Sequence, residues 1–132
     1  MEWTMMKKAI LILFLAFLLA GCGVSAGEPG YRQIGMGEAV HMMEEESGYI
    51  ILDVRTQEEF EDGHIPGAFN IPNEAIGTGG IAELPDKEQL ILVYCRSGNR
   101  SKQASKKLVA LGYTNIVEFG GINDWTGEIV SE

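Results

Sequence analysis

The chain has 132 residues, a length that suits one domain with one modest core. Its composition is that of a globular protein, with 45% hydrophobic and 22% charged residues, and its formal net charge at pH 7 is -9. A surface that binds nucleic acid has to be basic in order to hold phosphates. This acidity therefore argues against nucleic acid as a partner.

The first 21 residues have the pattern of an export signal. Lys7 and Lys8 precede Ala9–Ala20, an apolar run without a polar face, and Gly21-Cys22 follows. A basic start, a short apolar run and a small-residue cleavage zone are typical of a signal peptide. The run is shorter than the roughly 20 residues that a transmembrane helix needs. We therefore expect residues 1–21 to be removed.

The end of this signal, Leu19-Ala20-Gly21-Cys22, resembles the lipobox of bacterial lipoproteins. The resemblance implies cleavage before Cys22, a diacylglycerol thioether on its sulfur, and acylation of its amine. Several acyl chains anchor a protein stably, where one is marginal. The implied location is extracytoplasmic and lipid-anchored, on the outer face of the cytoplasmic membrane, or facing the periplasm in a Gram-negative cell. An ordinary secretory signal is the alternative.

The mature chain would begin with a tether, residues 22–30, which is small, polar and interrupted by a proline. The folded domain is expected from 31 to 132. Removing one acid and two lysines with the signal takes the net charge from -9 to -10. With Cys22 lipidated, Cys95 is the one free thiol of the mature chain. An unpaired cysteine in an exported protein is a candidate reactive thiol.

Apolar runs and helical patterns alternate along the domain. Strands are expected at Tyr49–Val54, Gln89–Tyr94 and Asn115–Phe119, which are apolar nearly throughout, as central strands of parallel sheets are. Helices are expected at Met36–Glu46, after the Thr56 to Glu59 capping box, and at Ser101–Leu111, where Gly112 ends the helix. The alternation predicts a single α/β domain with a mainly parallel central sheet flanked by helices.

Cys95 falls between the second expected strand and the helix at Ser101, where such sheets place their chemistry. A helix N-terminus and nearby cations both lower the pKa of a thiol. Of the eight Lys and Arg in the mature chain, five lie between Arg96 and Lys107. The sequence therefore predicts a loop that holds negative charge, namely that of a thiolate and of an anionic substrate.

The loop after Cys95 has the residues of an anion site. Gly98 and Asn99 tolerate left-handed backbone, which a tight turn with inward N–H groups requires. Arg100 offers a guanidinium fork to an oxyanion, and two serines offer hydroxyls to the thiolate or to the helix cap. The alternative is a buried structural cysteine before a lysine-rich helix whose Lys107 only faces water. The predicted site consists of Cys95, Arg96, Ser97, Gly98, Asn99 and Arg100, with Ser101 beside it.

An ordered set of motifs extends from Ile34 to Glu128. These motifs are LDVR at 52–55, EF at 59–60, GHIPGA at 63–68, NIP at 70–72, VYCRSGNRS at 93–101, and GGI at 120–122 with Trp125. The set resembles single-domain members of the rhodanese family of sulfurtransferases. The resemblance implies that Cys95 attacks the outer sulfur of thiosulfate or a similar donor, releases sulfite, and passes the sulfur from its persulfide to a thiol or cyanide. It also implies that no metal or organic cofactor is needed.

The length of the loop separates this function from others. Cys95 to Arg100 spells C-x4-R, whereas phosphatases that share the rhodanese fold resemble C-x5-R, with a wider cradle for a phosphoryl group. The shorter loop favours a sulfur-sized site over a phosphatase or arsenate reductase. Two other functions stay open. The domain could be a persulfide carrier for membrane-bound partner proteins, or a non-catalytic anion-binding or sensory module, against which the intact loop argues.

Four polar residues are interpreted as structural support for the site. Asp53 is expected to bond backbone near the strand that carries the cysteine, and Arg55 to pair with Glu59 across one helical turn. His64 is expected to hydrogen-bond within the turn of its motif. The functional alternatives are a general acid at Asp53 and a base at His64. A copper site at His41 with Met42 and Met43 is the remaining alternative, but methionines at helical spacing favour a helix core, and no metal site is predicted.

Overall fold

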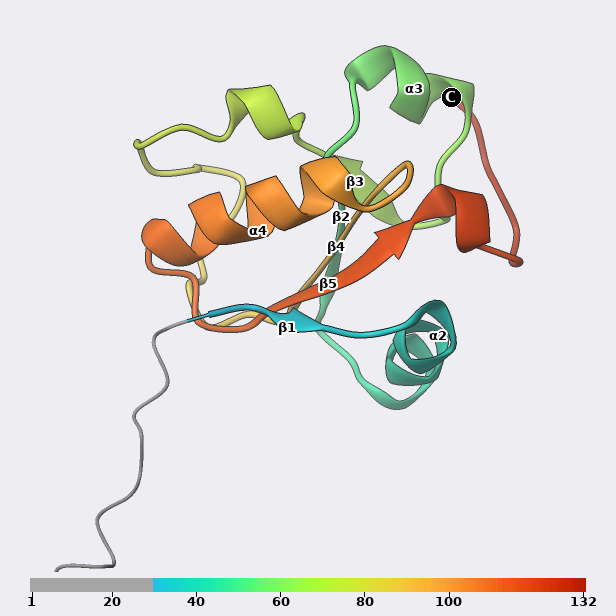
Figure 1. Cartoon of the computed structure of the whole chain (residues 1–132), viewed down its shortest axis with the longest axis horizontal. Helices are drawn as coiled ribbons and strands as arrows, with labels where there is room; N and C mark the ends of the chain where they lie inside the picture. Colours follow the sequence, from blue (N-terminus) through green and yellow to red (C-terminus); the bar gives the residue numbers. More distant parts are fainter. Residues whose placement is uncertain (1–29) are drawn as a thin grey trace, which may run out of the picture.

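The computed structural model describes residues 30–132; the predictions on residues 1–29, the signal peptide and Cys22 among them, lie outside the described residues. Five strands form one sheet in the order β1-β5-β4-β2-β3, and every pair of neighbours is parallel (Figure 1). This arrangement confirms the predicted fold class. The strands are β1 (Arg32–Gln33), β2 (Ile50–Asp53), β3 (Ala68–Asn70), β4 (Ile91–Cys95) and β5 (Ile116–Gly121).

Helices cover both faces of the sheet. Figure 1 shows α4 on one face and α2 on the other, with α3 beyond the end of the sheet where the strands finish. In no described helix is there an apolar stretch long enough to cross a membrane. The helices are α2 (Met36–Glu45), α3 (Gln57–Asp62) and α4 (Asn99–Ala110), and the short 3-10 helices are η1 (Asn73–Ala75) and η2 (Ile122–Asp124).

Strand β4 is buried along its whole length, because it lies in the middle of the sheet between two helical layers. Its side chains alternate between the two faces. Val93 and Cys95 pack in the core cluster under α4, with Leu108. Leu92 and Tyr94 pack in the cluster on the opposite face, under α2. The cysteine is therefore part of the core on the α4 side, at the end of the central strand.

The helix boundaries follow local chemistry. The Thr56 side chain accepts a hydrogen bond from the Glu59 N–H at 3.2 Å, which confirms the predicted cap of α3. Gly112 has a φ of +96° and ends α4 as predicted. Between residues 73 and 84, a stretch that contains three glycines, the only helix is the 3-10 turn η1. Helix α4 begins at Asn99, two residues before the predicted start, because the left-handed Gly98 turns the chain directly into it.

The register between β4 and β5 changes at the cysteine. Val93 pairs with Glu118, but Cys95 pairs with Gly121, so two steps along β4 match three along β5. Such a bulge bends its strand and is common beside active sites. Gly120, inside the bulge, has a φ of +94°. The bulge brings the end of β5 against the loop that follows Cys95.

Candidate active site

Cys95 is the last residue of β4 and lies at the floor of the loop that leads into α4. It is buried, with 1% of its surface exposed. Its Sγ accepts a hydrogen bond from the Gly98 N–H at 3.0 Å and lies 3.4 Å from the Ser101 Oγ. Burial raises the pKa of the thiol, but hydrogen bonds from Ser101, Gly98 and Ser97 outweigh this effect and leave the pKa below its ordinary value. The pKa of Cys95 is thus lowered in the direction that the sequence predicted, but hydrogen bonds rather than the predicted cations are the cause.

Gly98 gives the loop its shape. Its φ of +113° lies in the left-handed region, and its N–H points at the sulfur. Asn99, named with Gly98 as a residue that tolerates left-handed backbone, does not adopt it. Asn99 is the first residue of α4, and no non-glycine residue between 30 and 132 has a positive φ. One glycine is enough for the turn, because the helix starts at the next residue.

Gly121 closes the loop from the side of β5. A Cβ atom at this position would overlap the carbonyl group of Arg96 and lie 2.5 Å from the Ser97 nitrogen. The Asn123 N–H donates to the Arg96 carbonyl oxygen at 3.2 Å, which ties the loop to η2. Backbone thus packs directly against backbone, and only glycine allows this approach. The side chains of Arg96 and Ser97 point outward and are exposed.

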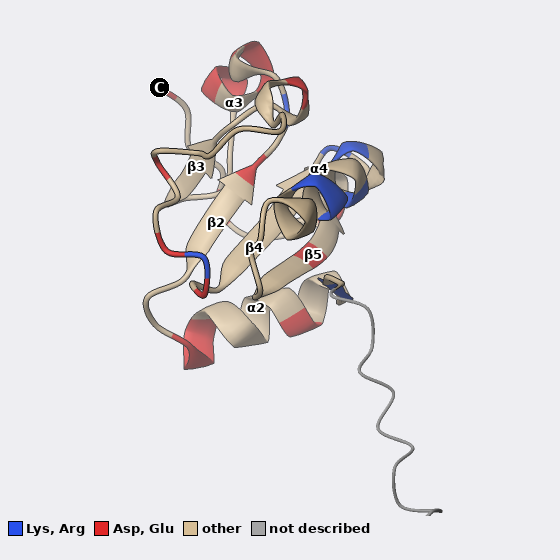
Figure 2. Ribbon diagram, turned by 90° about the vertical axis from the view of Figure 1, so that its left-hand side faces the viewer, with Lys and Arg blue, Asp and Glu red and all other residues tan. Residues whose placement is uncertain are grey.

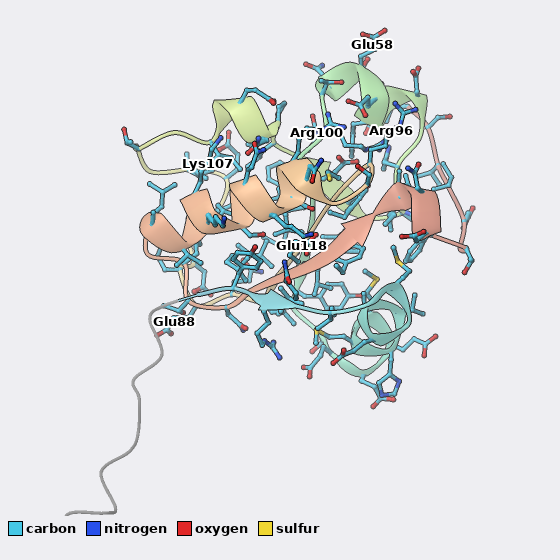
Figure 3. All side chains as sticks on the ribbon, in the orientation of Figure 1. Glu58, Glu88, Arg96, Arg100, Lys107 and Glu118 are labelled. Atoms are coloured by element: carbon cyan, nitrogen blue, oxygen red, sulfur yellow. The ribbon has the colours of Figure 1, made fainter. Side chains whose placement is uncertain are left out.

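Arg100, labelled in Figure 3, lies in the first turn of α4. It forms an ion pair with Glu59: its Nη1 lies 2.6 Å from Glu59 Oε1, and its Nη2 lies 3.1 Å from Oε2. The hydrogen bond with Arg100 is the main reason that the pKa of Glu59 falls to about 2. Glu59 belongs to α3, so the ion pair joins the acidic α3 to the basic α4 (Figure 2). The guanidinium that was expected to bind an oxyanion is thus held by a carboxylate of the protein.

The predicted pair between Arg55 and Glu59 is wrong. Arg55 is buried and binds both carboxylate oxygens of Asp53, with its Nη2 at 2.7 Å, and also donates to the Gly63 carbonyl oxygen at 2.7 Å. The physical reason is that Arg55 precedes Thr56, the cap of α3, so it is not on the helical face of Glu59. Asp53 accepts the Arg55 backbone N–H at 2.9 Å, and its predicted backbone bond is confirmed.

His64 has the structural contacts that the sequence predicted. Its Nδ1 lies 2.8 Å from the Phe60 carbonyl oxygen, which can only accept, so Nδ1 carries the proton. Its ring stacks on that of Phe60 with centroids 3.8 Å apart. Its backbone pairs with Val130 in an isolated antiparallel bridge. These contacts fix the end of α3 and the turn that follows it.

Glu118 is a site residue that the sequence analysis missed. It is buried in β5, with 3% of its surface exposed, and its Oε1 accepts the Ser101 hydroxyl at 2.7 Å and the Gly120 N–H at 2.8 Å. The signal was present in the sequence, as a single carboxylate inside an otherwise apolar strand. The apolar pattern of NIVEF predicts a strand but does not by itself assign a role to the carboxylate within it.

Lys107 is not simply solvated, as the alternative for the lysine-rich helix assumed. Its Nζ donates to the Asn73 carbonyl oxygen at 2.9 Å and lies 3.1 Å from Asn73 Oδ1. Asn73 also donates to Gln103 at 2.9 Å. These bonds fasten η1 to the outer side of α4. Lys102 and Lys106 are exposed.

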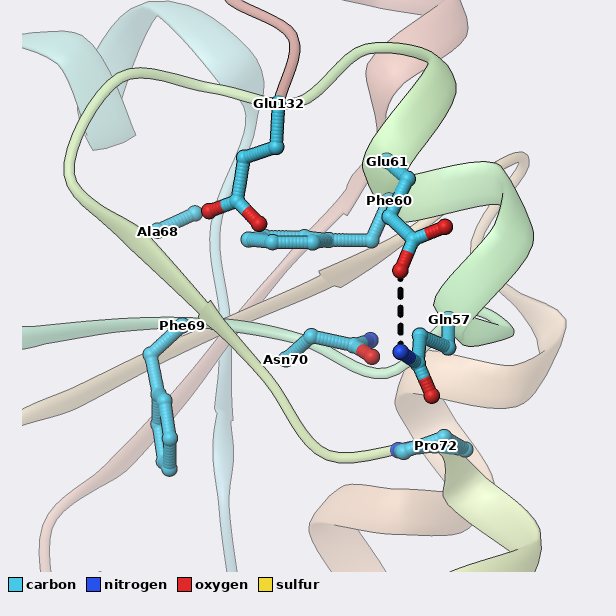
Figure 4. A pocket seen from close by; sticks show the side chains of 8 residues that line it. All are labelled: Gln57, Phe60, Glu61, Ala68, Phe69, Asn70, Pro72 and Glu132. Atoms are coloured by element: carbon cyan, nitrogen blue, oxygen red, sulfur yellow. Dashed lines mark hydrogen bonds between the residues drawn. The ribbon is translucent and has the colours of Figure 1, made fainter.

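An open pocket of about 400 Å³ lies between α3 and the edge strand β3 (Figure 4). A hydrogen bond of 2.9 Å between Gln57 and Glu61 crosses its wall. The pocket shares no residue with the Cys95 loop. Among residues 30–132, no three His, Cys, Asp or Glu side chains gather as metal ligands. The lining residues are Gln57, Phe60, Glu61, Ala68, Phe69, Asn70, Pro72 and Glu132.

Comparison with known proteins identifies the class to which this fold and site belong. Residues 36–128 match the model of the rhodanese-like domain. The chain therefore belongs to the rhodanese-like domain family, in agreement with the resemblance found in its sequence.

Individual relatives are similar over parts of the chain. It is 37% identical over 73 residues to thiosulfate sulfurtransferase PspE of Escherichia coli, and this match covers 55% of this chain and 70% of PspE. It is 39% identical over 90 residues to thiosulfate sulfurtransferase 16, chloroplastic, of Arabidopsis thaliana, covering 60% and 75% of the two chains. Three fungal proteins named adenylyltransferase and sulfurtransferase are much longer, and the chain spans only 21–28% of them.

A solved structure shows the same fold. The rhodanese-like domain protein from Staphylococcus aureus superposes with a TM-score of 0.66 at 29% identity, covering 76% of this chain and 98% of that one.

Proposed function

We propose that the protein is a sulfurtransferase that moves a sulfane sulfur through a persulfide on Cys95. The observation that carries the proposal is the setting of the Cys95 Sγ, which lies at the end of a central strand and accepts the Gly98 N–H at 3.0 Å. Its pKa is held below the ordinary value of a thiol by the hydrogen bonds around it. A thiolate is the nucleophilic form of cysteine.

The reaction consists of two displacements at sulfur. In the first, the Cys95 thiolate attacks the outer sulfur of thiosulfate; an S–S bond forms, the bond from that sulfur to the sulfonate breaks, and sulfite leaves with the electron pair. In the second, an acceptor thiolate or cyanide attacks the outer sulfur of the persulfide and releases the Cys95 thiolate. The enzyme returns to its starting state, as covalent ping-pong catalysis requires.

The protein groups that serve these steps belong to the loop 96–100. Gly98 turns its N–H toward the sulfur, and a persulfide built on Cys95 would carry its negative charge to the same concave backbone. Arg96 is exposed at the rim, where it can attract an anionic donor. The C-x4-R length favours sulfur over a phosphoryl group. The relatives named thiosulfate sulfurtransferase support this choice of donor.

The acceptor defines which form of sulfur transfer the protein performs. A small acceptor, such as cyanide or a low-molecular-weight thiol, predicts complete turnover by the protein alone. A protein acceptor makes the chain a persulfide carrier and predicts slow turnover alone with stimulation by the partner. Measuring sulfur release with each class of acceptor distinguishes the two.

We further propose that the mature protein is anchored outside the cytoplasm by lipid on Cys22. The support is the lipobox pattern Leu19-Ala20-Gly21-Cys22 after a basic and apolar leader. Labelling of expressing cells with palmitate, followed by fractionation, tests this proposal. Label in the membrane-bound protein that disappears in Cys22→Ser is expected, whereas an unlabelled, released protein would indicate an ordinary secretory signal.

The sulfur-transfer proposal is tested by intact mass of the chain from Gly23 onward after exposure to thiosulfate. We expect a gain of about 32 Da, the mass of one sulfur, that cyanide or dithiothreitol removes. The Cys95→Ser variant should show no gain. A wild-type protein that gains no mass from thiosulfate or from polysulfide would refute the proposal and favour an anion-binding module.

A further inference from the structure

A buried acid lies behind the nucleophile, and the steps proposed above do not use it. Glu118 shares the α4 face of β5 with Ile116, a core residue, and is 3% exposed. Figure 3 shows it beneath α4, at the side of the sheet on which the loop sits. Within residues 30–132 it forms no ion pair. Burying a carboxylate is costly, so its hydrogen bonds have to be strong ones.

The Ser101 hydroxyl connects Glu118 to Cys95. Its Oγ lies 2.7 Å from Glu118 Oε1 and 3.4 Å from the Cys95 Sγ. It also has the Gly98 carbonyl oxygen at 2.9 Å. A hydroxyl has one proton to donate. A carboxylate is a stronger acceptor than a carbonyl or a thiol, and it is also the nearest one here, so the proton points at Glu118.

This choice leaves a lone pair of Ser101 facing the sulfur. When Cys95 is a thiol, its S–H donates to the Ser101 Oγ, and the three groups form a chain that ends at Glu118. When Cys95 is a thiolate, the two negative groups compete for the one hydroxyl proton. The thiolate then keeps its backbone bonds, that of the Gly98 N–H among them, while Glu118 takes the larger share of the hydroxyl proton and so reduces the contribution of the Ser101 side chain to the low pKa of Cys95.

Two cations lie near the hydrogen-bonded series Cys95–Ser101–Glu118, and neither forms an ion pair with Glu118. Arg96 lies in the loop and Arg100 at the start of α4, and Arg100 is held by Glu59 of α3. The charges of Cys95 and of Glu74 in η1 also act on Arg100. The negative charge of Glu118, no more than about 6 Å from the sulfur through Ser101, therefore acts to make the thiolate more basic.

We propose that Glu118 is a positioning residue that holds the Ser101 proton away from Cys95, and so strengthens Cys95 as a nucleophile and weakens it as a leaving group. The inference rests on the proposed sulfur transfer. A more basic thiolate attacks the donor sulfur faster, and the same basicity slows its departure when the acceptor takes the outer sulfur. Glu118 would thus favour loading of the enzyme over its discharge.

Replacing Glu118 with Gln tests this idea with little change of shape. The Gln oxygen can still accept the Gly120 N–H, while the charge is gone. The rate at which iodoacetamide alkylates Cys95 is measured against pH, and its midpoint reports the pKa of the thiol. We expect this midpoint to fall by about 0.5 to 2 pH units, because the variant removes one negative charge about 6 Å from the sulfur in a medium whose dielectric constant lies between those of water and protein. Glu88→Gln is the matched control, because Glu88 is exposed at the opposite end of the molecule (Figure 3) and should leave the midpoint unchanged.

A second variant keeps the test decisive if Glu118→Gln does not fold. In Ser101→Ala the midpoint should rise by less than about 0.5 unit, because the hydroxyl proton is held by Glu118 rather than by the sulfur. A hydroxyl that donated to the thiolate would instead contribute about one to two units. A rise of that size, or a folded Glu118→Gln protein whose midpoint is unchanged or raised, overturns the proposal.

The two half-reactions complete the test. A less basic thiolate is a weaker nucleophile. For each unit by which the midpoint falls, the rate constant with which the Glu118→Gln thiolate takes sulfur from thiosulfate should therefore be about threefold lower. The same thiolate is a better leaving group, so the persulfide of the variant should pass its sulfur to cyanide faster. Equal changes in both half-reactions would contradict a role in this balance. If neither protein takes up sulfur, the proposed function fails, while the alkylation midpoints still decide the role of Glu118.

Discussion

The approach of Gly121 to the Cys95 loop makes Gly121→Ala the most informative single substitution. The added methyl would overlap the Arg96 carbonyl and lie 2.5 Å from the Ser97 nitrogen. Both neighbours are backbone atoms, so neither can rotate away as a flexible side chain would. The loop has to move outward by about 1.4 Å before the Arg96 carbonyl oxygen reaches ordinary contact with the new Cβ, at a cost of about 1–3 kcal/mol for overpacking.

That movement would also separate the Gly98 N–H from the Cys95 Sγ, now 3.0 Å apart. We expect the melting temperature to fall by about 4–8 °C for each kcal/mol lost. Misplacement by about 1 Å can cost a factor of the order of 100 in rate, so sulfur loading from thiosulfate should fall by about that much. Melting is followed by circular dichroism and loading by mass spectrometry.

The control for this substitution is Gly79→Ala, at an exposed position where a Cβ meets no atom within 4 Å. It should be neutral or slightly stabilising, because it reduces only the freedom of the unfolded chain. A Gly121→Ala protein with the melting temperature and loading rate of wild type would refute the reasoning, since it would show that the loop does not pack against β5 as described.

Three further outcomes are expected. Glu59→Gln should lose about 1 kcal/mol of stability at pH 7 in urea unfolding, because its ion pair with Arg100 is only partly buried and is screened by solvent. The pKa of Glu59 is lowered to about 2, so the difference in stability should persist above pH 4.5 and vanish as the pH falls toward 2. Gly98→Ala should lose about 1–2 kcal/mol from left-handed strain alone, as no atom is closer than 3.7 Å to the new Cβ; unchanged thermal stability would contradict this. Lys107→Met should lower stability by about 1 kcal/mol through its bonds to Asn73 and leave Cys95 alkylation unaltered, so a slower alkylation rate would link η1 to the site.

The fold was predictable because its signals are local and repeated. Strands apolar on both sides indicate a buried parallel sheet, and the Thr56 cap and Gly112 stop define helices by chemistry within a few residues. The position of Cys95 followed from the rule that parallel sheets bind ligands beyond their strand ends. The expected strand ends at Tyr94, whereas β4 ends at Cys95 itself. The apolar pattern could not resolve this difference of one residue.

The errors concern which charged side chains meet. Arg55 and Glu59 are four residues apart, a spacing that predicts a helical pair, but the cap at Thr56 leaves Arg55 outside the helix. Glu59 instead meets Arg100, 41 residues further along the chain. Such long-range pairing depends on how α3 and α4 are placed on the sheet. Local sequence carries no direct signal for it.

The bulge between β4 and β5 has a consequence for how this chain can change length. The extra residue lies between Glu118, which pairs with Val93, and Gly121, which pairs with Cys95. Deleting one residue there would leave Glu118 in place but move Gly121 away from Cys95 and from the Arg96 carbonyl group, or tear the end of the strand from its neighbour. The exposed connection with Gly77, Gly79 and Gly80 has no such constraint, since a Cβ at any of the three meets no atom within 4 Å. Insertions that give such a domain a new partner would be tolerated in that connection, while the residue count between Glu118 and Gly121 stays fixed.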